Sequence, residues 1–416
     1  MSAAGLRKGW CPGALRPMLS GDGLIVRLRL SCGELPMRMA SAIAELAALY
    51  GNGGIDLTQR ANLQLRGVRE ASLPSLTESL DDLGLIDASP EAEAVRNVTV
   101  SPLAGLDPAC RDGRALARAL EERLSRDAAL HALPAKFGFA IDGGGRWPLG
   151  ATGADVALCA DDAEGPWRIR LAGADLLSEP VEGSQATEAL ARVAQVFLRN
   201  GLRRMRDLVA QDGAQGVLER AGFASEQLRS DIKKAAQYTP GVHQVSRTGV
   251  IAAVGLAFGR IEAVDLAALT GACEPESVLR LTPWRMLLVP FSDEAAASMF
   301  VANCGALGLI ISAGDPRAFI DACTGAPGCI NATTGTRHDA ARLASRFPQL
   351  FTTPNALHVS GCAKGCALRG PARFTLVARE GRYDLIRNGA PGDAPHRTGI
   401  ASADLAAALM AAELMP

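Results

Sequence analysis

The sequence predicts an α+β protein made of two copies of one structural unit. The pair Leu57-Thr58 recurs as Leu281-Thr282, at an offset of 224 residues (58 to 282), and an alternating apolar run follows both. Gly23 opens one strand pattern and Gly249 opens another, and a small apolar helical pattern follows each strand. Because these similarities keep the same order, we expect an internally duplicated chain with pseudo-twofold symmetry and a ligand at the junction of its halves.

The smaller unit of each copy is expected near the start of each half. A helix is predicted at residues 37–50 in the first copy and at 262–270 in the second. Strands that alternate with one or two helices are typical of ferredoxin-like sheets. We therefore predict two ferredoxin-like half-domains, at residues 10–80 and 240–305.

A larger α/β unit is predicted after each half-domain, at residues 90–230 and 306–416. In the first of these units the region Thr187–Ser230 is expected to be mostly helical, because its apolar residues fall on one helical face. Two hairpin patterns in the same order support the duplication. The segments matched between the two units are 98–102 with 310–314, and 155–170 with 373–386.

Composition places the chain among globular proteins. Its 416 residues are 48% hydrophobic and 21% charged, and the net charge of −1 gives no reason to expect binding to nucleic acid or to an anionic membrane. We see no secretory signal pattern, and no apolar stretch approaches the length of a membrane span. A reduced, cytoplasmic protein is therefore expected, in which paired cysteines bind metal more often than they form disulfides.

Four cysteines near the C-terminus form two close pairs. Cys323 and Cys329 have five residues between them, and Cys362 and Cys366 have three. Four thiolates suit either a tetrahedral zinc ion or an iron–sulfur cube. Structural zinc sites favour two to four residues between paired ligands, so the first spacing favours a larger [4Fe–4S] cluster. A zinc-binding module without enzymatic activity and unligated structural cysteines are the alternatives.

Polar residues on predicted strands indicate a second kind of site. Arg27 and Arg29 alternate with apolar residues, so both are expected on one face of a sheet. A second strand over residues 57–66 is expected to present a polar face, and Lys136 precedes a strand of the larger unit. Guanidinium groups bind carboxylates bidentately, which makes this face a candidate floor for a polyanionic ligand, although it is also compatible with a solvated sheet surface. The candidate residues of this floor are Arg27, Arg29, Thr58, Arg60, Asn62, Gln64 and Lys136.

The doubled order of elements, the Thr-x-Arg-x-Asn-x-Gln run at 58–64, the stretch at 96–105 and the cysteine set together resemble the sulfite and nitrite reductases. The resemblance spans nearly the whole chain and implies their duplicated fold, with a [4Fe–4S] cluster on the four cysteines. Within that superfamily, the stretch Gly9–Met18 and the run at 359–367 most resemble the precorrin-3B synthases of aerobic cobalamin biosynthesis.

This resemblance implies an oxygenase that acts on a tetrapyrrole. A synthase of this kind hydroxylates precorrin-3A at C20 with O2, and a ring A acetate then closes a γ-lactone. NADH is the ultimate electron donor. The family is also described as carrying a mononuclear non-haem iron, for which His358 and His243 are the candidate ligands in this sequence. No nicotinamide-binding motif is visible, so a separate electron-transfer reductase is expected, and the duplicated chain is expected to act as a monomer.

A sirohaem-dependent assimilatory sulfite or nitrite reductase is the alternative function. The reductases carry a second basic residue two positions after the one that matches Lys136, and this chain has Gly138 there. The arginine in the second copy, Arg285, is displaced by one position relative to Arg60. These two departures favour the synthase over the reductase.

Overall fold

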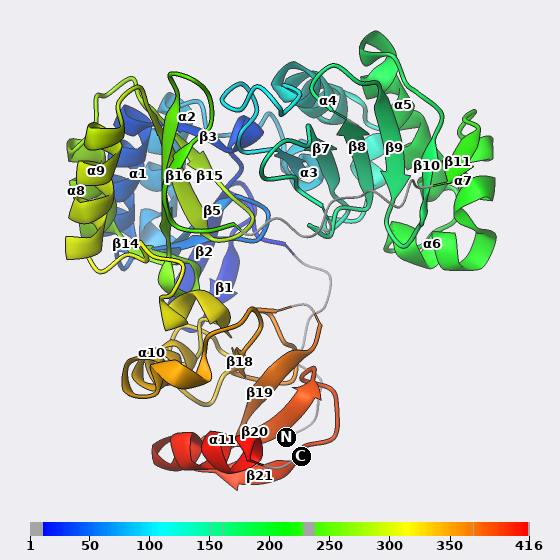
Figure 1. Cartoon of the computed structure of the whole chain (residues 1–416). Coiled ribbons are helices and arrows are strands. Elements are labelled where there is room, and N and C mark those ends of the chain that lie inside the picture. The colour runs from blue at the N-terminus through cyan, green and yellow to red at the C-terminus, as the bar shows by residue number, and fades with distance from the viewer. Residues whose placement is uncertain (1–10, 151, 161, 228–237, 369, 415–416) are drawn as a thin grey trace.

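The computed structural model describes residues 11–150, 152–160, 162–227, 238–368 and 370–414. In these residues the chain forms two half-domains that pack side by side and two α/β units that extend from them (Figure 1). Both the α+β class and the internal duplication are as predicted.

The sheet of the first half-domain takes its last strand from the second half of the chain. Its first four strands come from residues 18–68, and strand β14 completes it by pairing antiparallel with β4. The helices of this half-domain are α1 (Met37–Tyr50) and α2 (Leu73–Asp82), and the bounds of α1 match the prediction. In spatial order the strands are β1 (Met18–Ser20), β2 (Gly23–Leu28), β5 (Leu63–Val68), β4 (Gly54–Leu57) and β14 (Arg260–Glu262).

The sheet of the second half-domain repeats this arrangement and receives β3 from the first half in return. Its helices are α8 (Ala263–Gly271) and α9 (Glu294–Ala306). The two half-domains share one hydrophobic core, in which Val26 and Leu65 pack with Leu279 and Leu287. In spatial order the strands are β12 (Gly241–Gln244), β13 (Val250–Gly255), β16 (Met286–Phe291), β15 (Val278–Leu281) and β3 (Glu34–Pro36).

The first α/β unit is a mixed sheet with helices packed against it. β6, β7 and β8 are parallel, and β8 and β9 form the predicted antiparallel hairpin. The strands are β11 (Ser225–Gln227), β10 (Leu176–Ser178), β9 (Trp167–Leu171), β8 (Val156–Ala160), β7 (Phe139–Asp142) and β6 (Val98–Val100), and the helices are α3 (Pro90–Val95), α4 (Arg114–Arg126), α5 (Gly183–Leu198), α6 (Met205–Asp212) and α7 (Ala214–Arg220).

The second α/β unit repeats the order and directions of β6 to β10 in a sheet of five strands, without a counterpart of β11 among its described residues. β17, β18 and β19 are parallel neighbours, and β19 with β20 forms the second predicted hairpin. The counterpart of β6 is therefore β17, and the predicted match at residues 310–314 is wrong. Ile310 instead forms an isolated bridge with Gly255 of the half-domain. The elements are β17 (Ile320–Ala322), β18 (Leu357–Ser360), β19 (Ala372–Arg379), β20 (Arg382–Gly389), β21 (Arg397–Ile400), α10 (Thr336–Arg346) and α11 (Leu405–Glu413).

None of the described helices has the length and apolar character needed to cross a membrane.

Candidate functional site

The four cysteines lie on two loops that leave neighbouring parallel strands. Cys323 follows β17 and Cys362 follows β18, and the carboxyl ends of parallel strands meet at the same edge of a sheet. The Cys323 amide donates to Val359 O at 3.2 Å, and the Gly361 amide donates to Cys323 Sγ at 3.1 Å. The strand pairing thus sets the start of both loops and supplies one sulfur with an amide donor.

Glycines let these loops approach one another. A Cβ at Gly361 would lie 2.6 Å from Ala332 Cβ, and a Cβ at Gly325 would lie 2.5 Å from Thr336 Oγ1. Gly325 also has φ of +71°, a conformation that side chains disfavour. Both contacts are too close for any larger residue, so the glycines are required for the spacing between the cysteine-bearing segments.

The equivalent loops of the first α/β unit are held by hydrogen bonds to carboxylates. Asp142, at the end of β7, accepts from three loop amides, and Asp107 accepts from the Arg146 amide at 2.9 Å. In the second unit the position of Asp142 is taken by Ser360, whose hydroxyl donates only to Cys362 O at 2.7 Å. The second pair of loops therefore carries thiols where the first pair carries carboxylates that accept from loop amides.

Four free thiols are the donor set that binds a [4Fe–4S] cluster. All four thiols are free of disulfide bonds. Among the described residues, no three Cys, His, Asp or Glu side chains lie close enough together to hold one metal ion. In a [4Fe–4S] cube each thiolate binds a different iron, so the ligands stand farther apart than around zinc. Burial raises the pKa of the Cys362 and Cys366 thiols, and Lys364 opposes that rise at both.

The predicted strand over residues 57–66 is wrong, because a turn interrupts it. β4 ends at Leu57 and β5 begins at Leu63, and Thr58 Oγ1 accepts from the amides of Arg60 and Asn62. Ala61 adopts φ of +54°, which lies in the left-handed region and outside the extended region of a regular strand. The hydroxyl of Thr58 therefore closes the turn, and the polar residues around it do not form one face.

Two of the seven predicted carboxylate-binding residues, Arg60 and Lys136, lie near the loop that carries Cys366. Arg60 Nη2 donates to Lys136 O. Burial lowers the pKa of the Lys136 ammonium, Cys11 and Cys366 raise it, and the positive charges of Lys364 and Arg60 lower it further. Arg60, Lys136 and Lys364 thus form a cationic group, defined by these three residues, next to Cys366. Arg27 of β2 donates to Gln64 Oε1 on the neighbouring strand at 2.6 Å and shares the neighbour Cys11 with Lys136.

The remaining predicted residues have structural partners. Arg29 is buried and lies 3.1 Å from Glu93, and Glu93 also accepts from the amides of Ala14 and Leu15. Asn62 is buried within the turn, and Gln64 orients Arg27. Arg29 is held in a buried ion pair with Glu93, so we leave it out of the proposed binding set.

Three side chains that were not predicted hold the cysteine loops to the half-domains. Arg66 Nη2 donates to Gly328 O, next to Cys329. Gln59 and Arg285 both donate to Ala367 O, next to Cys366, at 2.8 and 2.6 Å. Gln59 falls between the alternating polar residues of the expected strand, so we did not place it on the polar face. Arg285 is displaced by one position relative to Arg60, so we assigned it no binding role.

The two candidate iron-binding histidines do not come together. His243 of β12 lies with its ring 5.1 Å from Trp147 and its Nε2 2.8 Å from Thr239 O. His358 of β18 is fully buried, and neither ring nitrogen has a hydrogen-bond partner. Burial lowers the pKa of His358 to about 4, with a contribution from Arg285. We assign no mononuclear iron site to the described residues.

His358 occupies a position that is apolar in the first α/β unit. The strand registers make Ala140 its counterpart, and they match the neighbouring Asp321 with Thr99. Asp321 Oδ1 lies 2.6 Å from Arg285 Nη1. Burial raises the pKa of the Asp321 carboxyl, and the Arg285 guanidinium acts to lower it. The first unit has alanine where the second has His358. The buried histidine next to Asp321 is therefore a feature of the second unit alone.

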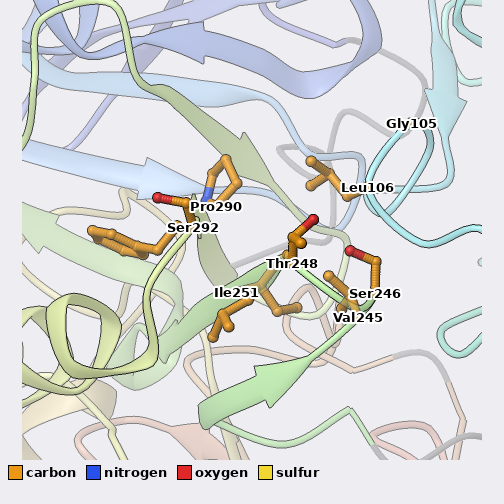
Figure 2. A pocket seen from close by; sticks show the side chains of 11 residues that line it. Gly105, Leu106, Val245, Ser246, Thr248, Ile251, Pro290 and Ser292 are labelled. Carbon is orange, nitrogen blue, oxygen red and sulfur yellow. The ribbon is translucent and has the colours of Figure 1, made fainter.

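A pocket of about 390 Å³ lies away from the cysteines (Figure 2). Leu106 borders it from the loop after β6, and Ser246 and Thr248 border it from the turn between β12 and β13. In the other half of the duplicated molecule the equivalent contact is closed, because Ser20 Oγ donates to Gly328 O at 2.7 Å. The pocket therefore marks where the two halves differ in packing.

Comparison with known proteins agrees with this architecture. The family profile described as "Nitrite/Sulfite reductase ferredoxin-like half domain" matches residues 16–83, and that described as "Nitrite and sulphite reductase 4Fe-4S domain" matches residues 91–222. A precorrin-3B synthase from Sinorhizobium sp. is 34% identical over 404 residues, which cover 95% of this chain and 86% of the relative. The chain belongs to the nitrite and sulfite reductase superfamily, in a family with precorrin-3B synthase.

More distant members of the superfamily match over most of their length. A ferredoxin–nitrite reductase from Synechococcus elongatus is 27% identical over 89% of this chain and 78% of its own length. The solved structure of the NirA protein of Mycobacterium tuberculosis superposes with a TM-score of 0.74 at 21% identity, covering 92% of this chain and 79% of that one. The superfamily fold is therefore shared across nearly the whole chain, although the second profile matches the α/β unit that lacks the four cysteines.

Proposed function

We propose that this chain is an oxygenase of the precorrin-3B synthase type. It would hydroxylate precorrin-3A at C20 and promote closure of the ring A acetate as a γ-lactone. One atom of O2 enters the product, the other leaves as water, and NADH supplies the two electrons. The observation that carries the proposal is the cationic group of Arg60, Lys136 and Lys364 beside Cys366, because precorrin-3A carries many acetate and propionate groups.

Two arginines of the proposed binding set, Arg27 and Arg60, are held in place by hydrogen bonds. Arg27 is oriented by Gln64, and Arg60 by its bond to the carbonyl of Lys136. Because both guanidinium groups are pre-positioned, little side-chain entropy is lost when a carboxylate binds. Lys136 and Lys364 add charge without fixed direction, which suits a ligand whose carboxylates lie at several angles.

Cys323, Cys329, Cys362 and Cys366 would hold the [4Fe–4S] cluster. The cluster supplies single electrons next to the macrocycle. The protein contributes the amide of Gly361 directed at Cys323 Sγ, which stabilises negative charge on that sulfur. We propose that a separate reductase passes electrons from NADH to this site and that the chain acts as a monomer.

A spectrum of anaerobically purified protein is the first test, with iron, zinc and acid-labile sulfide assayed on the same sample. We expect a broad blue-violet shoulder, about four sulfides per chain and no Soret band. Incubation with precorrin-3A, an electron source and ¹⁸O2 should then give a product with one heavy oxygen. A strong Soret band together with reduction of sulfite or nitrite would overturn the proposal in favour of a sirohaem reductase.

A further inference from the structure

The carbonyl of Ala367 is held from both halves of the duplicated molecule. Gln59 Nε2 donates to it at 2.8 Å and Arg285 Nη2 donates to it at 2.6 Å. Ala367 is 4% exposed, so water contributes little to this carbonyl and the two side-chain donors matter more. The residue next to it is Cys366, so the two donors act one peptide away from a proposed cluster ligand.

The two donors come from equivalent turns of the two half-domains. Gln59 lies in the turn between β4 and β5, and Arg285 lies in the turn between β15 and β16. Thr282 closes the second turn as Thr58 closes the first, and Arg285 has φ of +59° where Ala61 has +54°. The pseudo-twofold symmetry therefore brings two copies of one turn against a single cysteine loop.

Each turn is also fixed on its far side. Arg285 Nη1 lies 2.6 Å from Asp321 Oδ1, so the guanidinium spans the start of one cysteine loop and the end of the other. Gln59 directly precedes Arg60, whose guanidinium belongs to the cationic group and is anchored on Lys136 O. One peptide unit therefore connects the residue that would meet a carboxylate, Arg60, to the residue that donates to Ala367 O, Gln59.

We propose that Gln59 and Arg285 are positioning residues that couple tetrapyrrole binding to the loop that carries Cys366. This inference rests on the proposed function, because it takes the ligand of Arg60 to be a tetrapyrrole carboxylate. A bound carboxylate restrains Arg60 and its turn, and the restrained turn keeps Gln59 on Ala367 O. Opening of the Cys366 loop then becomes rarer when the macrocycle site is filled.

The loop contact is tested in cluster-free protein by hydrogen exchange of the backbone amides of residues 362–368, followed by peptide mass spectrometry. Gln59→Glu replaces the amide donor with an acceptor of the same size. Gln244→Glu is the matched control, because Gln244 is exposed and also donates to a backbone carbonyl, that of Ser246. We expect amide exchange over residues 362–368 to rise about three- to tenfold in Gln59→Glu and to stay unchanged in Gln244→Glu, the change expected from losing one hydrogen bond.

The coupling is tested by repeating the measurement with precorrin-3A under anaerobic conditions, with binding followed by absorbance. Precorrin-3A should slow amide exchange over residues 362–368 in the wild-type chain and in Gln244→Glu, and should not slow it in Gln59→Glu. Arg285→Lys keeps a cation near Asp321 and loses the nitrogen that reaches Ala367 O, so it should also raise exchange in the ligand-free protein and guards against misfolding of one variant.

The outcomes separate the inference from the proposed function. If precorrin-3A binds and residues 362–368 exchange at equal rates in the wild-type chain and both loop variants, the coupling is refuted and the function stands. If precorrin-3A does not bind to the wild-type chain, the proposed function fails and the coupling fails with it.

Discussion

Arg66 connects the first half-domain to the loop that carries Cys329, and the substitution Arg66→Met isolates that connection. The side chain is 3% exposed. Its Nε and Nη2 atoms donate to the two carboxylate oxygens of Asp22 at 3.2 and 2.8 Å, and Nη2 also donates to Gly328 O. Methionine is a flexible apolar side chain, so it removes the charge and the donors while filling much of the space.

The expected loss follows from what is left unpaired. Removing one partner of a buried, hydrogen-bonded charge pair costs about 3–5 kcal/mol. Asp22 keeps 13% of its side chain exposed, so water can recover part of that loss. We therefore expect the free energy of unfolding of the half-domain core to fall by about 2–4 kcal/mol.

Urea unfolding followed by far-ultraviolet circular dichroism measures this loss, and hydrogen exchange over residues 324–332 shows whether the loop is released. Arg38→Met is the control, because Arg38 is 64% exposed and lies 3.8 Å from an exposed Glu276. Such surface pairs contribute below about 1 kcal/mol. If the two variants unfold within about 1 kcal/mol of each other and exchange equally over 324–332, Arg66 does not hold the loop.

Three further substitutions test the site. Arg60→Ala should leave the visible spectrum intact and weaken precorrin-3A binding by roughly 1.5–3 kcal/mol in an absorbance titration, and unchanged affinity would remove Arg60 from the binding set. Cys362→Ser should bleach the blue-violet absorption, and a retained spectrum would exclude Cys362 as a ligand. Burial lowers the pKa of His358 from 6.5 to about 4, so between these pH values the unfolded chain binds more protons than the folded chain. Stability should therefore fall by up to about 3 kcal/mol as the pH drops from 6.5 to 4, and denaturant titrations across that window should show no such slope for His358→Gln.

Local pattern was enough to predict several elements of the fold. Helix α1 has the predicted bounds because its buried residues, Met37, Ala40, Ile43, Ala44 and Ala47, follow the helical period without interruption. The recurring Leu-Thr pair also identified equivalent positions of the two copies correctly, since Thr58 and Thr282 close matching turns. These features depend on contacts within a few residues, which a sequence displays directly.

Features that depend on distant partners were not predictable. Strands β3 and β14 have three residues each and pair with the opposite half-domain, and nothing within Glu34–Pro36 or Arg260–Glu262 indicates that exchange. We predicted a strand at 58–62 because Ala61 fits the apolar alternation of the sequence. Ala61 is buried as expected, but its positive φ places it in a turn. Arg29 was assigned to a binding floor because its partner, Glu93, is 64 residues away in the chain (29 to 93).

Duplication explains why the proposed site lies at the junction of the two halves. It also explains why only one of the two α/β units carries the four cysteines. Exchange of β3 and β14 ties the half-domains into one core, so their equivalent turns converge on one loop and bring Gln59 and Arg285 to the same carbonyl. One α/β unit kept loops closed by Asp142 and an apolar strand surface. The other kept the cysteines and placed His358 beneath them. In the proposed function a single cluster would therefore supply electrons from the second unit, and Arg60 and Lys136 of the first half would help to bind the substrate beside it.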